Sequence, residues 1–261
     1  MEINDFKEID QWIIGNYWVN SEIENLNQKL SIDIGPRWAT SDSEREAAHF
    51  IKAHWIANNL EAFHENFSIK TYKFDVAYFE SCKNAIEQIQ QDFGRTIDIV
   101  INNAGITKDR FLHKMAVEEW DAVIKTNLNS VFNVTRNVIE GMRKNGWGRI
   151  VSLSSINGVK GQIGQANYSA AKAGLIGFTK AIAQENANKG ITVNIIAPGY
   201  VGTDMVKKID PKILQGIVGQ IPVGRLADPG EIAALASYLC SEEAGFITGA
   251  TMNINGGQYM Q

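Results

Sequence analysis

Residues 149–197 read RIVSLSSINGVKGQIGQANYSAAKAGLIGFTKAIAQENANKGITVNIIA, and this stretch decides the fold class. It begins with an apolar run (149–154), passes through a glycine-containing loop into a long helical segment (166–189), and ends in a second apolar run (191–197). Two short apolar runs joined by a helix predict parallel strands with a crossover helix. Because neither run alternates with polar residues, we expect a sheet that is covered by helices on both faces.

The same alternation extends to both sides of this stretch. Further strands are predicted at residues 70–75, 97–102 and 251–254, and further helices at residues 78–93, 117–145 and 229–240. The sequence therefore predicts an α/β protein with a Rossmann-like, doubly wound parallel sheet over residues 70–261.

Residues 1–69 differ from the rest in composition. Only two of the 23 glycines, Gly15 and Gly35, lie before residue 94. Ser41 and Glu44 form a capping box at the head of one helical segment, and residues 9–30 also look helical. The residues from 61 to 75 alternate loosely and could include one strand. We predict a mostly helical leader (1–69) followed by a catalytic portion (70–261).

Composition and charge exclude several classes of partner. The chain has 261 residues, enough for one α/β domain, and a net charge of -4 without a Lys/Arg cluster, so nucleic acid is not an expected partner. Cys82 and Cys240 lie far apart, as expected of reduced thiols in a cytoplasmic protein. No apolar run reaches the length of a membrane span and no export signal is seen, so we expect no membrane partner.

The strongest chemical signal is Tyr168-Ser-Ala-Ala-Lys172 together with Ser155. Residues four apart on a helix share one face, and a nearby ammonium lowers the pKa of a phenol, which is otherwise about 10. Ser155 follows the strand at 149–154, at the carboxyl end, where open α/β sheets bind ligands. We expect Ser155 to hold a carbonyl oxygen while Tyr168 supplies a proton. Alone, such a Tyr/Lys pair is more often an ordinary surface feature.

Three weaker signals accompany it. NNAG (102–105) and PGYVGT (198–203) each follow a predicted strand, where glycine lets the backbone approach a flat ligand. Asn127 lies inside the predicted helix 117–145. Taken singly, NNAG is equally well explained as a plain turn, and Asn127 as a solvated helix residue.

Together, in this order, the motifs resemble those of the short-chain dehydrogenases/reductases. The resemblance implies a catalytic tetrad of Asn127, Ser155, Tyr168 and Lys172. In it, Tyr168 is the general acid, Lys172 also binds the nicotinamide ribose, and Asn127 holds a water of a proton relay. The resemblance further implies NADP(H) as cofactor, bound by Asp75, Val76, Asn102, Asn103, Ala104, Gly105, Ile106, Tyr168, Lys172, Pro198, Gly199, Val201 and Thr203.

Within that family, the strings NNAGITKDRFLHKM (102–115), GYVGTDMV (199–206) and INGGQYM (254–260) are similar to those of the acetoacetyl-CoA reductases of polyhydroxybutyrate synthesis. This similarity implies reduction of a 3-oxoacyl-CoA to the (R)-3-hydroxyacyl-CoA with NADPH, by a homotetramer. The 3-oxoacyl-carrier-protein reductases, which share the tetrad, are the nearest alternative. The acyl-CoA site implied by the similarity consists of Asp109, Gln162, Ile163, Gln165 and Tyr200, with Ile163 where these enzymes often carry Phe.

One family element is missing from the sequence. Members begin with a strand, a glycine-rich turn and a helix, which place backbone N–H groups on the cofactor pyrophosphate. Gly15 and Gly35 stand alone and cannot form that turn, and the basic residues that select NADPH are missing as well. Loss of the first strand would leave an unpaired edge on the strand at 97–102, which the leader could cover without rebuilding the phosphate-binding turn. A catalytically impaired or non-enzymatic subunit is therefore the alternative function.

The leader carries a second resemblance. The stretch LSIDIGPRWATSDSEREAAHFIKAHWIANNL (30–60) resembles the N-terminal segment of the zinc-dependent aminopeptidase-like family, over about residues 5–68. It implies a chimera of that segment with a reductase. The zinc ligands of that family lie beyond the segment, and His49 and His54 are five residues apart and share no helix face. We therefore expect neither a metal site nor peptidase chemistry.

Overall fold

The computed structural model describes residues 12–18, 29–34, 70–203, 206 and 211–260. Its elements, in chain order, are β1 (Trp12–Trp18), β2 (Lys29–Ile34), β3 (Lys70–Lys73), α2 (Phe79–Phe93), β4 (Ile99–Asn102), η2 (Leu112–Lys114), α3 (Val117–Ile124), η3 (Lys125–Asn129), α4 (Ser130–Asn145), β5 (Gly148–Leu153), α5 (Ile156–Lys160), α6 (Ala166–Asn186), η4 (Ala187–Lys189), β6 (Ile191–Pro198), α8 (Pro211–Val218), α9 (Pro229–Cys240) and β7 (Thr251–Ile254).

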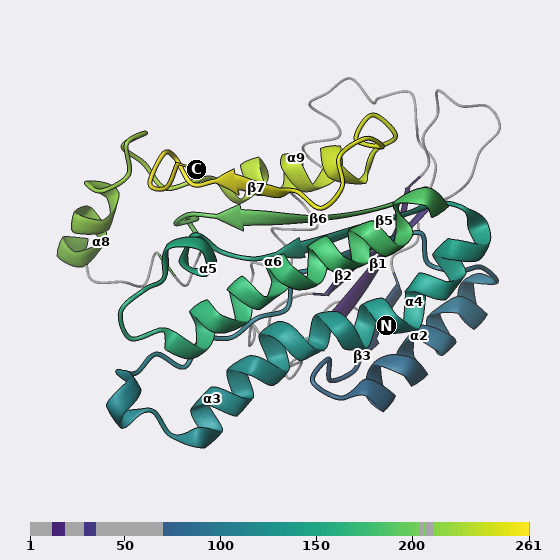
Figure 1. Ribbon diagram of the computed structural model, residues 1–261, viewed down its shortest axis with the longest axis horizontal. Coiled ribbons are helices and arrows are strands. Elements are labelled where there is room, and N and C mark those ends of the chain that lie inside the picture. The colour runs from purple at the N-terminus through teal and green to yellow at the C-terminus, as the bar shows by residue number, and fades with distance from the viewer. Residues whose placement is uncertain (1–11, 19–28, 35–69, 204–205, 207–210, 261) are drawn as a thin grey trace.

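One sheet runs through the described residues, in the order β3-β1-β2-β4-β5-β6-β7. From β2 to β7 all neighbouring strands are parallel, whereas β1 is antiparallel to both β2 and β3. Helices α2, α4 and α6 lie on one face, and α9 packs on β5 and β6 from the other (Figure 1). This arrangement confirms the predicted α/β class.

Burial on both faces explains why the central strands are mostly apolar. In β5, Ile150 packs into the core formed with α2 and α4, and its neighbour Val151 packs against α9. In β6, Val193 joins the first of these cores and Ile196 the second. Successive side chains of a strand point to opposite faces, so a strand that is covered on both sides carries apolar residues toward both.

Most predicted elements of the catalytic portion are present. The helix at 229–240 and the strand at 251–254 have the predicted bounds. The long helix at 117–145 is divided into α3 and α4 by the π-helical turn η3. The short helices α5 and α8 were not predicted, because each is too brief to show a helical period in the sequence.

One prediction about residues 1–69 is wrong. Residues 9–30 were expected to be helical, yet β1 is a strand, in keeping with the aromatic and β-branched residues of WIIGNYW. The edge of β4, which the leader was expected to be able to cover, is paired with β2, which lies parallel to it with Ser31 opposite Ile99. The open edge of β4 offers backbone hydrogen bonds to β2, and β1 pairs with β2 in turn, which favours strands over the predicted helix. The predicted helix after Ser41 lies outside the described residues, and the division at residue 69/70 stays a prediction.

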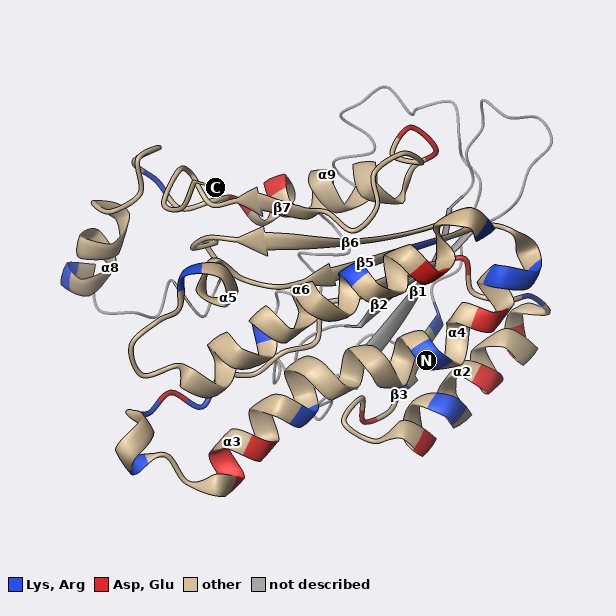
Figure 2. Cartoon of the chain, viewed as in Figure 1, with Lys and Arg blue, Asp and Glu red and all other residues tan. Residues whose placement is uncertain are grey.

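Charged residues of both signs alternate along the helices on the outer face. On α2 a single Lys lies among Asp and Glu, and acidic residues gather at the start of α3 (Figure 2). Among the helices that the structure describes, none is long and apolar enough to cross a membrane.

Candidate active site

The candidate site lies at the edge where the parallel strands end. The arrows of β5, β6 and β7 point to the same side of the molecule, and α5 lies at that end (Figure 1). The motifs NNAG, Ser155 and PGYVGT follow β4, β5 and β6 respectively, so the parallel arrangement brings them to one edge. This edge is where open α/β sheets bind their ligands.

Tyr168 and Lys172 lie together at the beginning of α6. Lys172 Nζ is 5.7 Å from the centre of the Tyr168 ring, and it donates a hydrogen bond to the Leu153 carbonyl, at 2.6 Å. The lysine is buried, only 4% exposed, in the core face of the helix. Because burial disfavours its charged form, the pKa of Lys172 falls to about 8. A lysine in this state can lose and regain a proton near neutral pH.

The pKa of Tyr168 is raised, and the expectation of a lowered pKa is therefore wrong. Burial of the phenol is the largest cause, a hydrogen bond with the Ser155 side chain acts in the opposite direction, and the charge of Asp109 adds to the rise. Lys172, whose Nζ lies 5.7 Å from the centre of the ring, does not reverse this effect. Tyr168 thus keeps its proton at neutral pH, which suits a group that donates one.

Ser155 is held by the first turn of α5. It is the N-cap residue of this helix, and its Oγ accepts a hydrogen bond from the Asn157 backbone N–H, at 3.1 Å. The neighbouring Ser154 Oγ donates to the Lys172 carbonyl, at 2.8 Å. A Cβ atom on Gly158 would lie 2.8 Å from the Lys172 backbone. Glycine is therefore needed at this position, because α5 rests directly on α6 beside the lysine.

Asn127 is fully buried and is not a solvated helix residue. Its Oδ1 accepts from the Ile106 backbone N–H, at 2.8 Å, and its Nδ2 donates to the Ile106 carbonyl, at 2.9 Å. The π-helical turn η3 contains Asn127, and such turns are frequent at functional sites. The same contact holds Gly105 close to the lysine, since a Cβ there would lie 3.5 Å from Lys172 Nζ. Asn127 thus fixes the NNAG loop against α6.

The remaining residues expected to contact a cofactor lie along the same edge. Asn102 is buried, donates to Ser152 Oγ at 3.2 Å, and has an Oδ1 atom without a hydrogen-bond partner in the described part of the chain. The Asn133 side chain donates to the Val76 carbonyl, which ties the end of β3 to α4. A Cβ on Gly199 would lie 2.9 Å from the Asn255 backbone. The unpartnered Oδ1 of Asn102, and Gly105 with its lack of a side chain beside Lys172, fit a flat polar ligand.

The structure connects only part of the residues expected at the acyl-CoA site. Gln165 donates to the Asp109 carboxylate, at 2.8 Å, whereas Ile163 is 80% exposed. Gln162 is also exposed, and Tyr200 instead lines a cavity of about 120 Å³ with residues that include Ile221, Val223 and Arg225.

Two residues of the site were missed. Asn157 donates to Gln165 Oε1, at 2.9 Å. The fully buried Asn167 donates to the carbonyls of Lys108 and Glu119, which ties the loop after β4 to the start of α6. A lone asparagine carries no signal of its own in the sequence. The one available sign was that both residues lie within the segment from Ser155 to Tyr168, one near each end.

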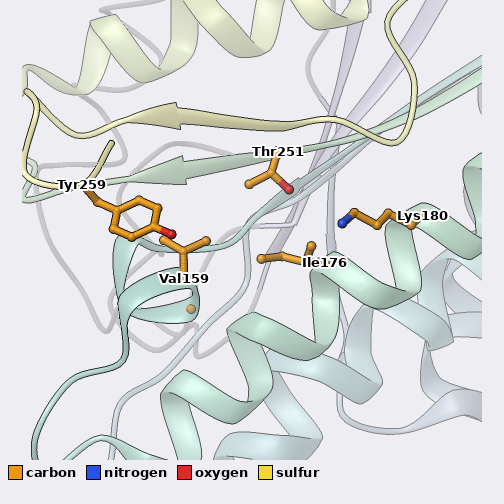
Figure 3. Close-up of a pocket in the computed structure, with 6 residues that line it drawn as sticks. Val159, Ile176, Lys180, Thr251 and Tyr259 are labelled. Atoms are coloured by element: carbon orange, nitrogen blue, oxygen red, sulfur yellow. The ribbon is translucent and has the colours of Figure 1, made fainter. Parts of the chain in front are cut away.

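A separate cavity of about 380 Å³ lies between α5, α6 and β7. Ile176 and Lys180 extend from α6, Thr251 belongs to β7, and Val159 and Tyr259 close one end (Figure 3). No tetrad residue lines this cavity, so it is distinct from the candidate active site.

The fold and the site together define a short-chain dehydrogenase/reductase. Over residues 42–258 the chain matches the family described as "Enoyl-(Acyl carrier protein) reductase", and it belongs to this family. Membership implies a nicotinamide cofactor. The match begins within residues 5–68, where a resemblance to the aminopeptidases was expected, and the comparisons give that second resemblance no support.

The particular relatives are reductases of acyl thioesters and a nodulation protein. The acetoacetyl-CoA reductase of Shinella zoogloeoides is 53% identical over 224 residues, which cover 85% of this chain and 92% of that protein. Nodulation protein G of Azospirillum brasilense is 60% identical over 183 residues, 70% of this chain and 74% of that protein. The 3-oxoacyl-[acyl-carrier-protein] reductase of Salmonella typhimurium is 48% identical over 180 residues, 69% and 73% of the two chains.

Proposed function

We propose that this chain reduces a 3-oxoacyl-CoA, with acetoacetyl-CoA as the first substrate to test, to the (R)-3-hydroxyacyl-CoA at the expense of NADPH. The observation that carries the proposal is the meeting of Ser155, Tyr168 and Lys172 at the carboxyl end of β5. The similarity to a curated acetoacetyl-CoA reductase supports the choice of substrate, and with it a role in polyhydroxybutyrate synthesis.

The surroundings of each residue support its catalytic role. Ser155 presents a hydroxyl that can hold the ketone oxygen, beside the phenol of Tyr168. Tyr168 keeps its proton at neutral pH and transfers it to that oxygen as negative charge develops there. Lys172, with its pKa of about 8, is suited to return a proton to the phenol. Asn127 holds the loop at Gly105 against the lysine and, by family resemblance, holds the water that links Lys172 to solvent.

A bound reduced nicotinamide supplies the hydride that is added to the carbonyl carbon. We propose that Lys172 binds its ribose, and that the residues at the ends of β3, β4 and β6 line the rest of the cofactor. Support comes from the unpartnered Asn102 Oδ1 and from the glycine at position 105. The proposed contacts are Asp75, Val76, Asn102, Asn103, Ala104, Gly105, Ile106, Pro198, Gly199, Val201 and Thr203.

The acyl-CoA is proposed to lie against Asp109, Gln162, Ile163, Gln165 and Tyr200. The pairing of Gln165 with Asp109 supports this placement, since both then belong to one wall of the site. The similarity to a carrier-protein reductase favours a second candidate, a 3-oxoacyl-carrier-protein substrate. The ratio of kcat/KM for acetoacetyl-CoA and acetoacetyl-carrier protein decides between the two substrates.

A cofactor titration tests the reductase against the non-enzymatic alternative. NADPH is added to the purified chain while nicotinamide fluorescence is followed, and oxidation is then started with acetoacetyl-CoA. We expect micromolar binding, and turnover that is lost in Tyr168→Phe while binding remains. No binding at millimolar NADPH would instead establish a non-enzymatic subunit, as the absence of the glycine-rich turn suggests. Sedimentation of the same sample tests the homotetramer that family resemblance implies.

A further inference from the structure

A chain of side-chain amides crosses from α5 to the loop after β4. Asn157 Nδ2 donates to Gln165 Oε1, at 2.9 Å, and Gln165 Nε2 donates to Asp109 Oδ2, at 2.8 Å. Asn157 is also bonded to Ser155, because its backbone N–H donates to Ser155 Oγ, at 3.1 Å. One residue thus joins the serine hydroxyl to the wall formed by Gln165 and Asp109.

The carboxylate of Asp109 fixes the direction of every bond in this chain. A carboxylate accepts hydrogen bonds and cannot donate them, so Gln165 must turn its Nε2 toward Asp109. Gln165 Oε1 then faces Asn157, which must donate a hydrogen bond to it from Nδ2. The orientation of both amides therefore follows from a single negative charge at the far end.

This orientation leaves Asn157 with an unfavourable arrangement. Its Oδ1 is buried and, in the described part of the chain, has no hydrogen-bond partner. An unsatisfied buried acceptor is destabilising, so the side chain does not hold this position for the sake of stability alone. The benefit must lie in what the other end of the amide secures, which is the bond from Nδ2 to Gln165 that holds the first turn of α5, where Ser155 is the N-cap residue.

We propose that Asn157 is a positioning residue for the reduction. Through Gln165 it ties the Ser155 turn to Asp109, so that the hydroxyl that holds the ketone and the wall that holds the acyl chain keep a fixed distance. The inference rests on the proposed function. Asn157 need not touch the substrate, since it acts through Ser155 Oγ on one side and Gln165 on the other.

The test reverses the direction of the hydrogen bonds between Asn157, Gln165 and Asp109. Asn157→Asp keeps the size of the side chain but places carboxylates at both ends of Gln165, whose amide oxygen must then face one of them. Adding Asp109→Asn removes this conflict: the new amide at position 109 donates to Gln165 Oε1, and Gln165 Nε2 donates to the new carboxylate at position 157. The double variant has the same net charge as the wild type.

We expect Asn157→Asp to lower kcat on the order of tenfold or more, because catalysis tolerates little displacement of a reacting group. Because Asp109 is itself a proposed acyl-CoA contact, Asp109→Asn is measured alone as a second baseline, and the double variant is compared with both single variants. The double variant should regain most of the lost kcat, while Asn157→Ala should lose kcat and gain nothing from Asp109→Asn. The KM for NADPH should be unchanged throughout.

Melting temperatures, and the matched control Asn188→Asp at an exposed position of η4, separate this effect from a loss of folding. The proposal is overturned if Asn157→Asp keeps the wild-type kcat, if Asp109→Asn fails to restore it, or if it restores Asn157→Ala equally. A wild-type chain without acetoacetyl-CoA reduction would refute the proposed function itself, and the positioning role would fall with it.

Discussion

Replacement of Gly158 by alanine tests how closely α5 must lie on α6. The added Cβ would be 2.8 Å from both the backbone carbon and the Cβ of Lys172, and 2.9 Å from Ser154 Oγ. Ordinary contact begins at 3.4 Å, so the difference between 3.4 and 2.8 requires α5 to move by about 0.6 Å. The two Lys172 atoms cannot rotate away, because one belongs to the backbone and the other is bonded to it, and Ser154 Oγ could turn aside only by losing its hydrogen bond to the Lys172 carbonyl.

The same displacement is passed to Ser155, which begins α5. Misplacement of a catalytic group by about 1 Å lowers a rate on the order of a hundredfold, so a shift of about 0.6 Å should lower kcat by roughly tenfold. Overpacking should also reduce the free energy of unfolding by about 1–3 kcal/mol. The KM for NADPH should change little, since the cofactor loops are not displaced.

Initial rates at saturating acetoacetyl-CoA and urea unfolding measure the two effects. The matched control is Gly177→Ala, at an exposed position of α6 where a Cβ meets nothing within 4 Å. That variant should gain about 0.5–1 kcal/mol of stability, because alanine suits a helix interior better than glycine, and should keep its kcat. If Gly158→Ala matched the wild type in both measurements, the contact between α5 and α6 would not be what positions Ser155.

Three further predictions concern other parts of the molecule. Lys172→Met should abolish reduction yet raise the free energy of unfolding at pH 7 by about 1–3 kcal/mol, because the folded pKa of about 8 lies below the ordinary 10.5. Between pH 8 and pH 10.5, roughly, Lys172 binds a proton in the unfolded chain but not in the folded one, so the free energy of unfolding of the wild type rises with pH through this window. Urea titrations at pH 7 and pH 10 should therefore show that the stability advantage of the variant shrinks. Asn127→Ala releases both bonds to Ile106 and should weaken NADPH binding by roughly tenfold in a fluorescence titration; an unchanged Kd would contradict its role in fixing the loop. Asp228→Ala removes the acceptor for the Gly230 N–H at the start of α9 and should lower stability by about 1 kcal/mol with kcat unchanged, as calorimetry and initial rates can check.

The sequence predicts those features that depend on local pattern. The nearly continuous apolar runs of β5 and β6 indicate a sheet covered on both faces, and the spacing of Tyr168 and Lys172 places them on one helix face. The pairing of β2 with β4 could not be predicted, because it depends on a backbone partner some seventy residues away. The direction of the Tyr168 pKa depends on burial, which no spacing reveals.

Asn157 shows the same limit within the site. Its place two residues after Ser155 explains why its backbone N–H donates to Ser155 Oγ. Its side-chain bond to Gln165 instead depends on how the loop between α5 and α6 folds back, which the local sequence does not reveal. The sequence does not reveal the π-helical turn either, because KTNLN has nothing that distinguishes it from a regular helical turn.

That turn makes the chain between α3 and α4 sensitive to length rather than to residue type. A wide turn holds one residue more than a regular one, and each residue rotates a helix by about 100°. Deletion of a single residue from η3 would leave a regular helical turn, which keeps the stripe of Val134, Val138 and Met142 toward the sheet but removes the widened turn that places Asn127 at Ile106. Variants of this protein should accept many substitutions in α4, whereas a change in the number of residues in η3 should lose the contact that fixes the NNAG loop.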